Sequence, residues 1–307
     1  MNNNQDDESE VAKPYLNVPL PTLGGKQFWT DYAWRRGWRL QKNAMTGLWR
    51  VLDDRNIRQA WGPQAACEDV LQKQVPVASL KHPRVFILLH GLIRSASSMA
   101  SLEKVLEKEF DCEVLCFEYA STRDSISKHA EAFRAYVASL PPNTKIALVG
   151  HSMGNIVARH AIGDWQRAKD SHTLERIDRF VMLGPPNQGA SIARQLSKIG
   201  LFEWITGEGG MELGPKWEEF EGRLATPHCE FGIIAGRLEN QPIQNPLVDG
   251  EGDFVVSVEE AKLEGSNDFL ELPRLHSFLM DDAEVQRAVI HFMKTGRFTK
   301  SSAESGQ

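Results

Sequence analysis

The sequence lacks several features that would assign it to a particular class. It has no apolar run near the roughly 18 residues that a membrane-spanning helix needs. Residues 1–13 are polar and acidic, without the basic and then apolar order of a secretory signal. Basic residues number 35 against 41 acidic ones, and a net charge of −6 does not favour a general nucleic-acid binder. These absences predict a cytoplasmic globular protein.

Cysteine is also scarce. The four residues Cys67, Cys112, Cys116 and Cys229 show neither metal-binding spacing nor a disulfide framework. Cys112 and Cys116 would lie on one face of a single strand, roughly 13 Å apart, which is too far for a disulfide. Free thiols agree with a reducing compartment.

The most informative stretch is Gly150-His151-Ser152-Met153-Gly154, a Gly-x-Ser-x-Gly pattern typical of a nucleophile elbow. An apolar run at 145–149 precedes it and predicts a buried strand, and residues 155–165 predict a helix. A serine on such a turn is held out of the sheet. Any side chain at Gly150 or Gly154 would collide with its neighbours.

From residue 84 onward, predicted strands and helices alternate, which indicates an α/β fold with a mostly parallel sheet of about six strands and helices on both faces. The sequence Asp281 to Glu284 resembles a capping box at the start of the last helix. The expected strands are 85–89, 113–119, 145–149, 179–183, 231–235 and 268–272, and the expected helices are 98–110, 125–140, 155–165, 190–198 and 284–294.

A serine nucleophile needs a histidine base and an acid that orients it. Among nine histidines, His276 follows the last predicted strand and precedes the final helix, which is where a base should lie. Asp249, Glu251 and Asp253 are the candidates for the acid. Asp253 is preferred because the apolar residues 254–256 that follow can fix it against the sheet. Calcium binding by this acidic run is the less favoured alternative, so no metal and no cofactor are expected.

Two backbone donors are expected to stabilise the oxyanion: the N–H of Met153 after the nucleophile, and the N–H of Leu92 in the loop after the first strand. The candidate substrate contacts are His90, Gly91 and His151, together with Trp204 and Trp217. The two tryptophans belong to an apolar, glycine-containing segment, 191–227. This segment is interpreted either as a cap over the serine or as an ordinary crossover.

The order Ser152, acid, His276 resembles that of the α/β-hydrolase family. The runs Leu89-His90-Gly91-Leu92, Gly150 to Gly154 and Leu183 to Ala190 are similar to those of bacterial triacylglycerol lipases and related esterases. In that family the third run usually carries Thr and two His where this chain has Pro185, Asn187 and Gln188. The resemblance covers about residues 84–293 and implies ester hydrolysis.

The segment before the alternating region contains five of the eight tryptophans. Trp34, Trp38, Met45, Leu48 and Leu52 follow helical spacing, so a Trp-rich helical extension is predicted over 25–80, with one more short helix at 65–73. Packing of these tryptophans on the main domain is favoured over peripheral membrane contact through Trp29–Trp49.

The predicted organisation is therefore an acidic disordered tail (1–24), the extension (25–80), a catalytic domain (84–295) and a second disordered tail (296–307). The expected activity is that of a serine esterase or lipase acting on a small-molecule or lipid ester through an acyl-enzyme on Ser152. A thioesterase or acyltransferase with the same triad is one alternative. A non-catalytic interaction scaffold is another, because fold alone fixes no function.

Overall fold

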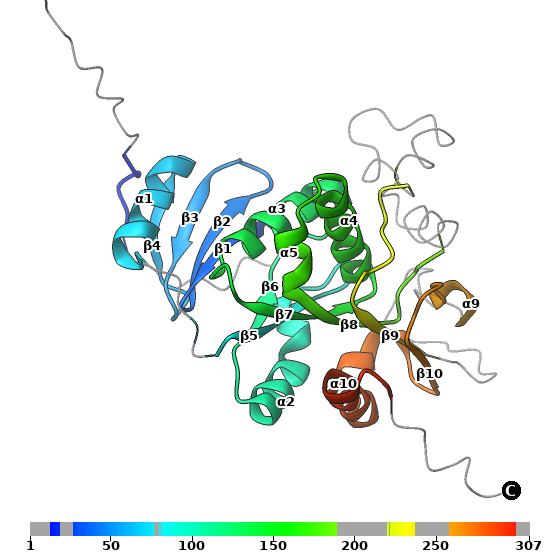
Figure 1. The fold of residues 1–307 in the computed structure, drawn as a ribbon. Coiled ribbons are helices and arrows are strands. Elements are labelled where there is room, and N and C mark those ends of the chain that lie inside the picture. The colour runs from blue at the N-terminus through cyan, green and yellow to red at the C-terminus, as the bar shows by residue number, and fades with distance from the viewer. Residues whose placement is uncertain are drawn as a thin grey trace, which may run out of the picture.

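The computed structural model describes residues 13–18, 27–76, 80, 82–188, 220, 222–236 and 258–298. Its centre is a six-stranded parallel sheet in the order β10-β9-β8-β7-β5-β6 (Figure 1). The strands are β5 (Arg84–Leu89), β6 (Val114–Phe117), β7 (Lys145–His151), β8 (Ile177–Leu183), β9 (Glu230–Gly236) and β10 (Asp268–Leu272).

Helices cover both faces of this sheet, as the strand and helix pattern predicted. On one face lie α3 (Ile126–Ala138) and α4 (Met153–Arg167), with the short α5 (Ser171–Arg176) beside them. On the other face lie α2 (Ala100–Phe110), which follows the 3-10 turn η1 (Ala96–Met99), and α10 (Ala283–Thr295), which follows η2 (His276–Asp281). A further short helix is α9 (Val258–Ala261).

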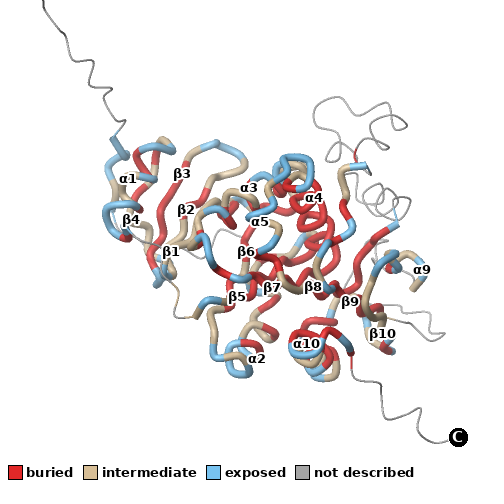
Figure 2. The backbone as a smooth tube through the Cα atoms, in the orientation of Figure 1, coloured by how far each residue is buried: buried red, intermediate tan, exposed pale blue. Residues whose placement is uncertain are grey.

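The central strands are apolar on both sides because each side contacts a different core. Val85, Ile87 and Leu89 of β5 belong to the core under α3 and α4. Phe86 and Leu88, which alternate with them, belong to the core under α2 and α10. Figure 2 shows this as an almost continuous buried stretch through β5, β7 and β8. A continuous apolar run is what a strand buried on both faces requires.

The N-terminal extension is a sheet and not a helical unit, so the predicted helices there are wrong. Four antiparallel strands lie in sequence order: β1 (Trp29–Arg35), β2 (Trp38–Asn43), β3 (Trp49–Leu52) and β4 (Arg58–Gly62). The helix expected near 65–73 is confirmed as α1 (Gln64–Gln74).

Glycine lies in the turns of this sheet. Arg36 and Gly37 both have positive φ, 50° and 87°, and they join β1 to β2 in the two-residue turn geometry that suits the twist of a hairpin. The strand alternation is hidden in the sequence because both faces of the sheet carry large side chains. Leu40 and Trp49 belong to the core beside α1. On the opposite face of the sheet, Asp31, Gln41 and Arg50 form a buried, hydrogen-bonded polar row.

The tryptophans of the extension are used in packing. Trp49 is buried and meets Tyr32 edge-on at 4.7 Å, and the Arg50 guanidinium stacks 3.9 Å from the Trp29 ring. Among the described residues, none of the five tryptophans belongs to the exposed large hydrophobic side chains. None of the described helices has the length and apolar character needed to cross a membrane.

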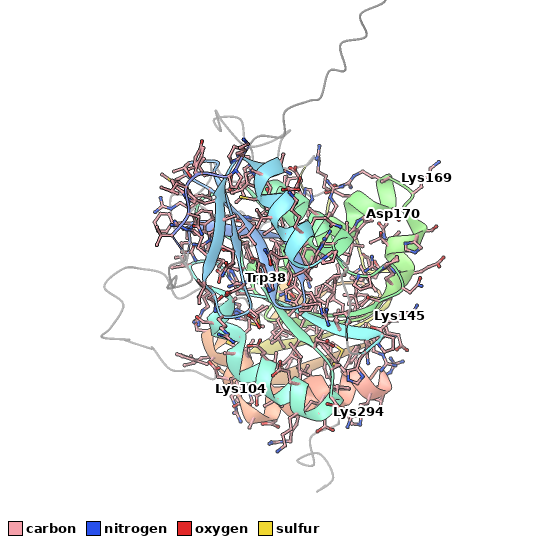
Figure 3. The ribbon with its side chains drawn as sticks, turned by 90° about the vertical axis from the view of Figure 1, so that its left-hand side faces the viewer. Trp38, Lys104, Lys145, Lys169, Asp170 and Lys294 are labelled. Atoms are coloured by element: carbon pink, nitrogen blue, oxygen red, sulfur yellow. The ribbon has the colours of Figure 1, made fainter. Side chains whose placement is uncertain are left out.

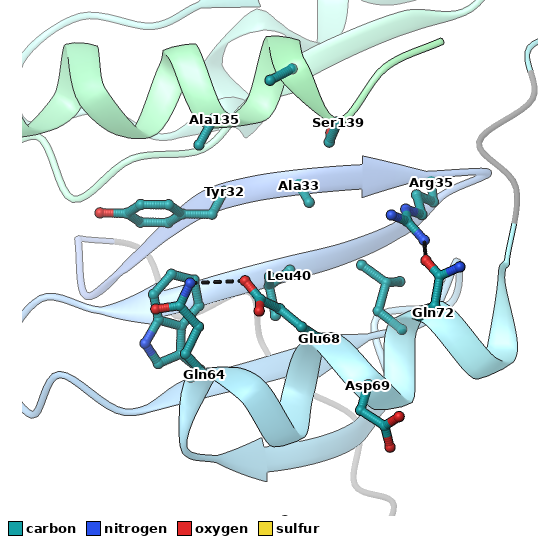
Figure 4. A pocket seen from close by; sticks show the side chains of 13 residues that line it. Tyr32, Ala33, Arg35, Leu40, Gln64, Glu68, Asp69, Gln72, Ala135 and Ser139 are labelled. Atoms are coloured by element: carbon teal, nitrogen blue, oxygen red, sulfur yellow. Dashed lines mark hydrogen bonds between the residues drawn. The ribbon is translucent and has the colours of Figure 1, made fainter. Parts of the chain in front are cut away.

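The extension lies against the edge of the main sheet, with β1 along α3. A groove of about 580 Å³ follows this joint and is lined by Tyr32, Leu40 and Trp49 of the sheet and by side chains of α1 and α3. Figure 4 shows Tyr32 and Leu40 on the strands between the two helices. Viewed from the side of the extension, Trp38 of β2 lies well apart from Lys104 of α2 and Lys294 of α10 (Figure 3). The groove contains neither Ser152 nor His276.

Residues 13–18 and 296–298, which lie within the segments predicted as tails, make defined contacts. The Tyr15 N–H donates to the Trp61 carbonyl (2.9 Å), so part of residues 13–18 pairs with the free edge of β4. After α10, Gly296 caps the helix with φ 77°, and Phe298 is buried against Phe292 at 4.9 Å. The capping residue of α10 is Asp282, which accepts the N–H groups of Glu284 and Val285, and not Asp281.

Candidate active site

The elbow has the geometry that its sequence predicts. Ser152 lies between β7 and α4 with φ 50° and ψ −120°, a strained conformation for a residue with a side chain. A Cβ at Gly150 would lie 2.3 Å from Asn155 Oδ1, and one at Gly154 would lie 2.5 Å from the Leu89 carbonyl. Both glycines are therefore required by close contact, as expected.

Backbone and side-chain hydrogen bonds fix the strained serine to the neighbouring strand. The Ser152 N–H donates to the Leu183 carbonyl of β8 (2.9 Å). The buried Asn155 amide donates to the carbonyls of Ser152 (3.0 Å) and Leu183 (3.2 Å). Asn155 thus stabilises the elbow through two hydrogen bonds. The Gly-x-Ser-x-Gly motif did not predict this role, and the only signal in the sequence was the position of Asn155 in the first turn of α4.

The loop after β5 lies directly against the serine. A Cβ at Gly91 would come within 3.2 Å of Ser152 Cβ and within 2.9 Å of His151 Nδ1. Leu92, whose N–H is a predicted oxyanion donor, follows in the same loop. Met153, the other predicted donor, is the first residue of α4. Its N–H therefore has no acceptor within the helix and lies at the positive end of the helix dipole.

His276 is brought to the elbow by His151. The His151 Nε2–H donates to the His276 carbonyl (2.9 Å), and the two rings lie 5.0 Å apart. His276 opens η2 after β10, at the carboxyl edge of the sheet, where the sequence placed it. The structure therefore gathers Ser152, Gly91 and the His276 loop at one edge.

Gly184 forms the surface on which the His276 ring rests. Its φ is 51°, and a Cβ there would lie 2.5 Å from His276 Nδ1. This glycine lies in the Leu183–Ala190 run, yet its contact with the base could not be deduced from sequence spacing. A residue without a side chain after β8 is thus needed to seat the histidine.

Burial keeps both histidines of this pair neutral. Burial, and then the Arg94 charge, lower the pKa of His276 to about 4. Burial, and then His276, hold the pKa of His151 well below its ordinary value. At neutral pH the His276 imidazole is therefore unprotonated, which is the form that a general base needs.

The predicted substrate contacts divide into two groups. His90 and His151 are 0% and 2% exposed, so their rings lie behind the loops that they support and do not face solvent. A role for these two residues in direct substrate contact is therefore limited to their backbone. Asp253, Asp249, Glu251, Trp204, Trp217 and most of the 191–227 segment lie outside the described residues.

Among the described residues, no group of three or more His, Cys, Asp or Glu side chains could hold a metal ion. The four cysteines are all described and all free. Burial raises the pKa of Cys67 to about 11 and that of Cys229 to about 12, which makes them unreactive thiols.

The parallel sheet order, the helices on both faces and the strained serine at a strand-to-helix turn define the α/β-hydrolase fold. The chain belongs to the family described as "Domain of unknown function (DUF7379)", which it matches over residues 49–215. That match begins in the extension at β3 and runs through the elbow.

Solved structures resemble this chain at low sequence identity. Tomato methylketone synthase I, complexed with 2-tridecanone, is 15% identical, with coverage of 69% of this chain and 98% of that chain, and a TM-score of 0.47. A lipase-esterase related protein from Clostridium acetobutylicum is 15% identical, with coverage of 70% and 94%, and a TM-score of 0.41. RedJ thioesterase from Streptomyces coelicolor is 17% identical, with coverage of 70% and 86%, and a TM-score of 0.43. The comparison with curated proteins gave no match.

Proposed function

We propose that this protein is a serine hydrolase that cleaves carboxylic esters through an acyl-enzyme on Ser152. The observation that carries the proposal is that a strained elbow serine lies next to the His276 loop. The residue before the serine, His151, donates a 2.9 Å hydrogen bond to the His276 carbonyl. An unreactive structural serine has no need of a strained backbone that three separate contacts maintain.

In this mechanism His276 removes the Ser152 proton as the hydroxyl attacks the ester carbonyl. The N–H groups of Leu92 and Met153 stabilise the oxyanion that forms. His276 then donates its proton to the leaving alcohol, and afterwards activates the water that releases the acid. Asp253 is the proposed partner that orients His276 and stabilises the imidazolium. No cofactor takes part in these steps.

Apolar residues around the predicted site favour an acyl substrate. Ile93, in the loop after β5, is 58% exposed, and Leu275 and Phe278, on either side of His276, are 41% and 56% exposed. The two loops are neighbours, because η1 packs against η2. Exposed large apolar side chains gathered in this way are typical of a binding surface for apolar ligands. The proposed cap residues Trp204 and Trp217 would extend this surface.

The test is a panel of aryl esters from acetyl to palmitoyl, with an acyl thioester included, assayed on wild type and on Ser152→Ala. Loss of a triad nucleophile typically lowers turnover by about 10⁴-fold or more. Ser152→Ala should therefore be inactive while its circular dichroism spectrum is unchanged. A variant that retained a tenth of the wild-type rate would exclude Ser152 as the nucleophile. A preference for the thioester would change the substrate class but not the nucleophile.

A further inference from the structure

The loop that carries the predicted oxyanion donor contains a strained turn. The Arg94 N–H donates to the Gly91 carbonyl (3.3 Å) and closes a turn over Leu92 and Ile93. Ile93 has φ 60°, the left-handed region that β-branched residues rarely adopt. Such strain costs about 1–3 kcal/mol and persists only where the surroundings hold it.

The main domain holds this loop at its two ends. At the start, the Gly91 carbonyl accepts from His90 Nδ1–H (2.9 Å), and the His90 ring stacks on Tyr119 at 4.1 Å. At the far end, Glu118 Oε2 accepts the Ala96 N–H (3.1 Å). Because a peptide group is planar, fixing the Gly91 carbonyl also fixes the direction of the Leu92 N–H. The exit of the turn, at Arg94, lies between these two points.

Gln27, from the segment before β1, hydrogen-bonds to the backbone at the end of that turn. Its Nε2–H donates to the Arg94 carbonyl. Its Oε1 accepts three hydrogen bonds, from Ser121 Oγ (3.1 Å), Thr122 N–H (3.0 Å) and Thr122 Oγ1 (2.8 Å). Three donors on the oxygen side fix the orientation of the amide, so its nitrogen must face Arg94. Gln27 therefore connects the loop after β5 to the loop after β6.

The position of Gln27 is itself set by β1, which is attached to the end of β6. The Asp31 N–H donates to the Glu118 carbonyl (2.9 Å), and Asp31 Oδ2 accepts the Glu118 N–H (2.9 Å). Thr30 Oγ1 accepts the Ala120 N–H (3.1 Å). The extension is thus joined to the residue whose carboxylate holds Ala96, as well as to the loop that receives Gln27.

We propose that Gln27 is a positioning residue for catalysis: through the Arg94 carbonyl it holds the strained Gly91–Arg94 turn in the conformation that aims the Leu92 N–H at the oxyanion. This gives the N-terminal sheet a part in the chemistry, although it contributes no group that touches substrate. The expected effect on turnover rests on the proposed function. The expected effect on the order of the loop rests only on the hydrogen bonds described above.

The experiment compares Gln27→Ala with Gln72→Ala, a matched change of the same residue type in α1, where Gln72 bonds Arg35 away from the loop. Hydrogen–deuterium exchange of residues 91–96 gives the structural readout. It should rise in Gln27→Ala and stay at the wild-type level in Gln72→Ala. This readout does not require turnover.

The kinetic readout is kcat and KM for the best aryl ester, together with Ki for a trifluoromethyl ketone whose adduct carries an oxyanion. Losing one oxyanion donor costs about 10²–10³-fold, and loosening one should cost less, about tenfold in kcat, with KM unchanged. Ki should rise in proportion to the loss of kcat/KM. A purely structural role would lower the amount of active enzyme without changing Ki.

The outcomes separate the two proposals. Faster exchange at 91–96 with a parallel rise in Ki supports the positioning role. Unchanged exchange and unchanged Ki in Gln27→Ala overturn it, whatever the activity of the wild type. A third outcome is faster exchange in Gln27→Ala together with a wild type that hydrolyses no ester and binds no ketone. Gln27 would then still order the Gly91–Arg94 turn. The proposed activity and the role of Gln27 in catalysis would both be excluded.

Discussion

The elbow and the N-terminal sheet are encoded in opposite ways. At the elbow, the residue types can be read from a five-residue motif: Gly150 and Gly154 allow close approach of neighbouring atoms, and Ser152 occupies the turn. In the N-terminal sheet, the meaning of a residue depends on partners far along the chain, as Asp31 depends on Glu118 and Gln27 on Arg94. The first kind of information can be read from a short motif, whereas the second becomes visible only after folding.

The largest expected effect lies on the elbow side of this comparison and concerns the acid. Asp253→Asn should lower turnover by about 10⁴-fold, because the wrong histidine tautomer forms and the imidazolium loses its partner. Asp249→Asn should matter little, since the neighbouring Gly250 makes Asp249 the less favoured candidate from the sequence. Both variants are assayed side by side, with folding checked by circular dichroism. A dead Asp249→Asn beside an active Asp253→Asn would reverse the assignment.

Gly184 offers a second test on the active-site side of the comparison. Gly184→Ala should lower kcat/KM by about 10²-fold, because its Cβ would lie 2.5 Å from His276 Nδ1 and displace the base. Gly47→Ala is the matched control. Gly47 also has positive φ, 71°, but nothing lies within 4 Å of its Cβ position, so this variant carries the backbone strain without the crowding. Equal losses in the two variants would mean that strain and not the position of the histidine is responsible.

In the extension, Trp49 distinguishes between two interpretations of the tryptophans, packing in the core and contact with a membrane. Trp49→Ala should destabilise the protein by about 3–5 kcal/mol, because a buried tryptophan is removed from the core beside α1. Met45→Ala, at a side chain that is 63% exposed, should change stability by less than about 0.5 kcal/mol. Urea unfolding measures both changes. If Trp49→Ala lost binding to anionic vesicles while keeping its stability, the membrane interpretation would replace the packing one.

The smallest expected effect is a shift in pH dependence. Protonated His276 cannot act as a base, so kcat/KM should fall as pH drops through its pKa of about 4. The Arg94 charge contributes to that low value by disfavouring the imidazolium. Arg94→Gln should therefore move the acidic limb to higher pH and leave the rate at pH 8 nearly unchanged. Arg94→Lys keeps the charge and should shift the limb less. Equal shifts in both variants would contradict an electrostatic role.

The main domain could be predicted well from the sequence because apolar runs and turns alternate there with a single period. The strand expected at 268–272 is found at Asp268–Leu272, and the strand expected at 231–235 is found at Glu230–Gly236. The placement of Ser152 and His276 at one edge of the sheet followed from the same logic, since the ends of parallel strands meet there. Their supports Gly184, Asn155 and Glu118 did not follow, because each acts through a contact between distant segments.

The extension was mispredicted for a physical reason. Both sides of its strands carry tryptophan. Trp49 lies in the core beside α1, and Trp29 and Trp61 lie beside Arg50 in the buried polar row of Asp31, Gln41 and Arg50. Neither face therefore shows the apolar and polar alternation of a half-exposed strand. The aromatic positions happened to match a helical period. The Arg36-Gly37 pair was the available signal for a hairpin, and its positive φ values show why glycine was needed there.

The most direct test of the central claim is intact-protein mass spectrometry after reaction with a fluorophosphonate. The account predicts a single adduct on wild type, located by digestion to the peptide that contains Ser152. It also predicts no adduct on Ser152→Ala, and much slower labelling of His276→Ala, which keeps the nucleophile but loses the base. An adduct on Ser152→Ala at another serine, or a wild type that stays unlabelled while correctly folded, would contradict Ser152 as an activated nucleophile.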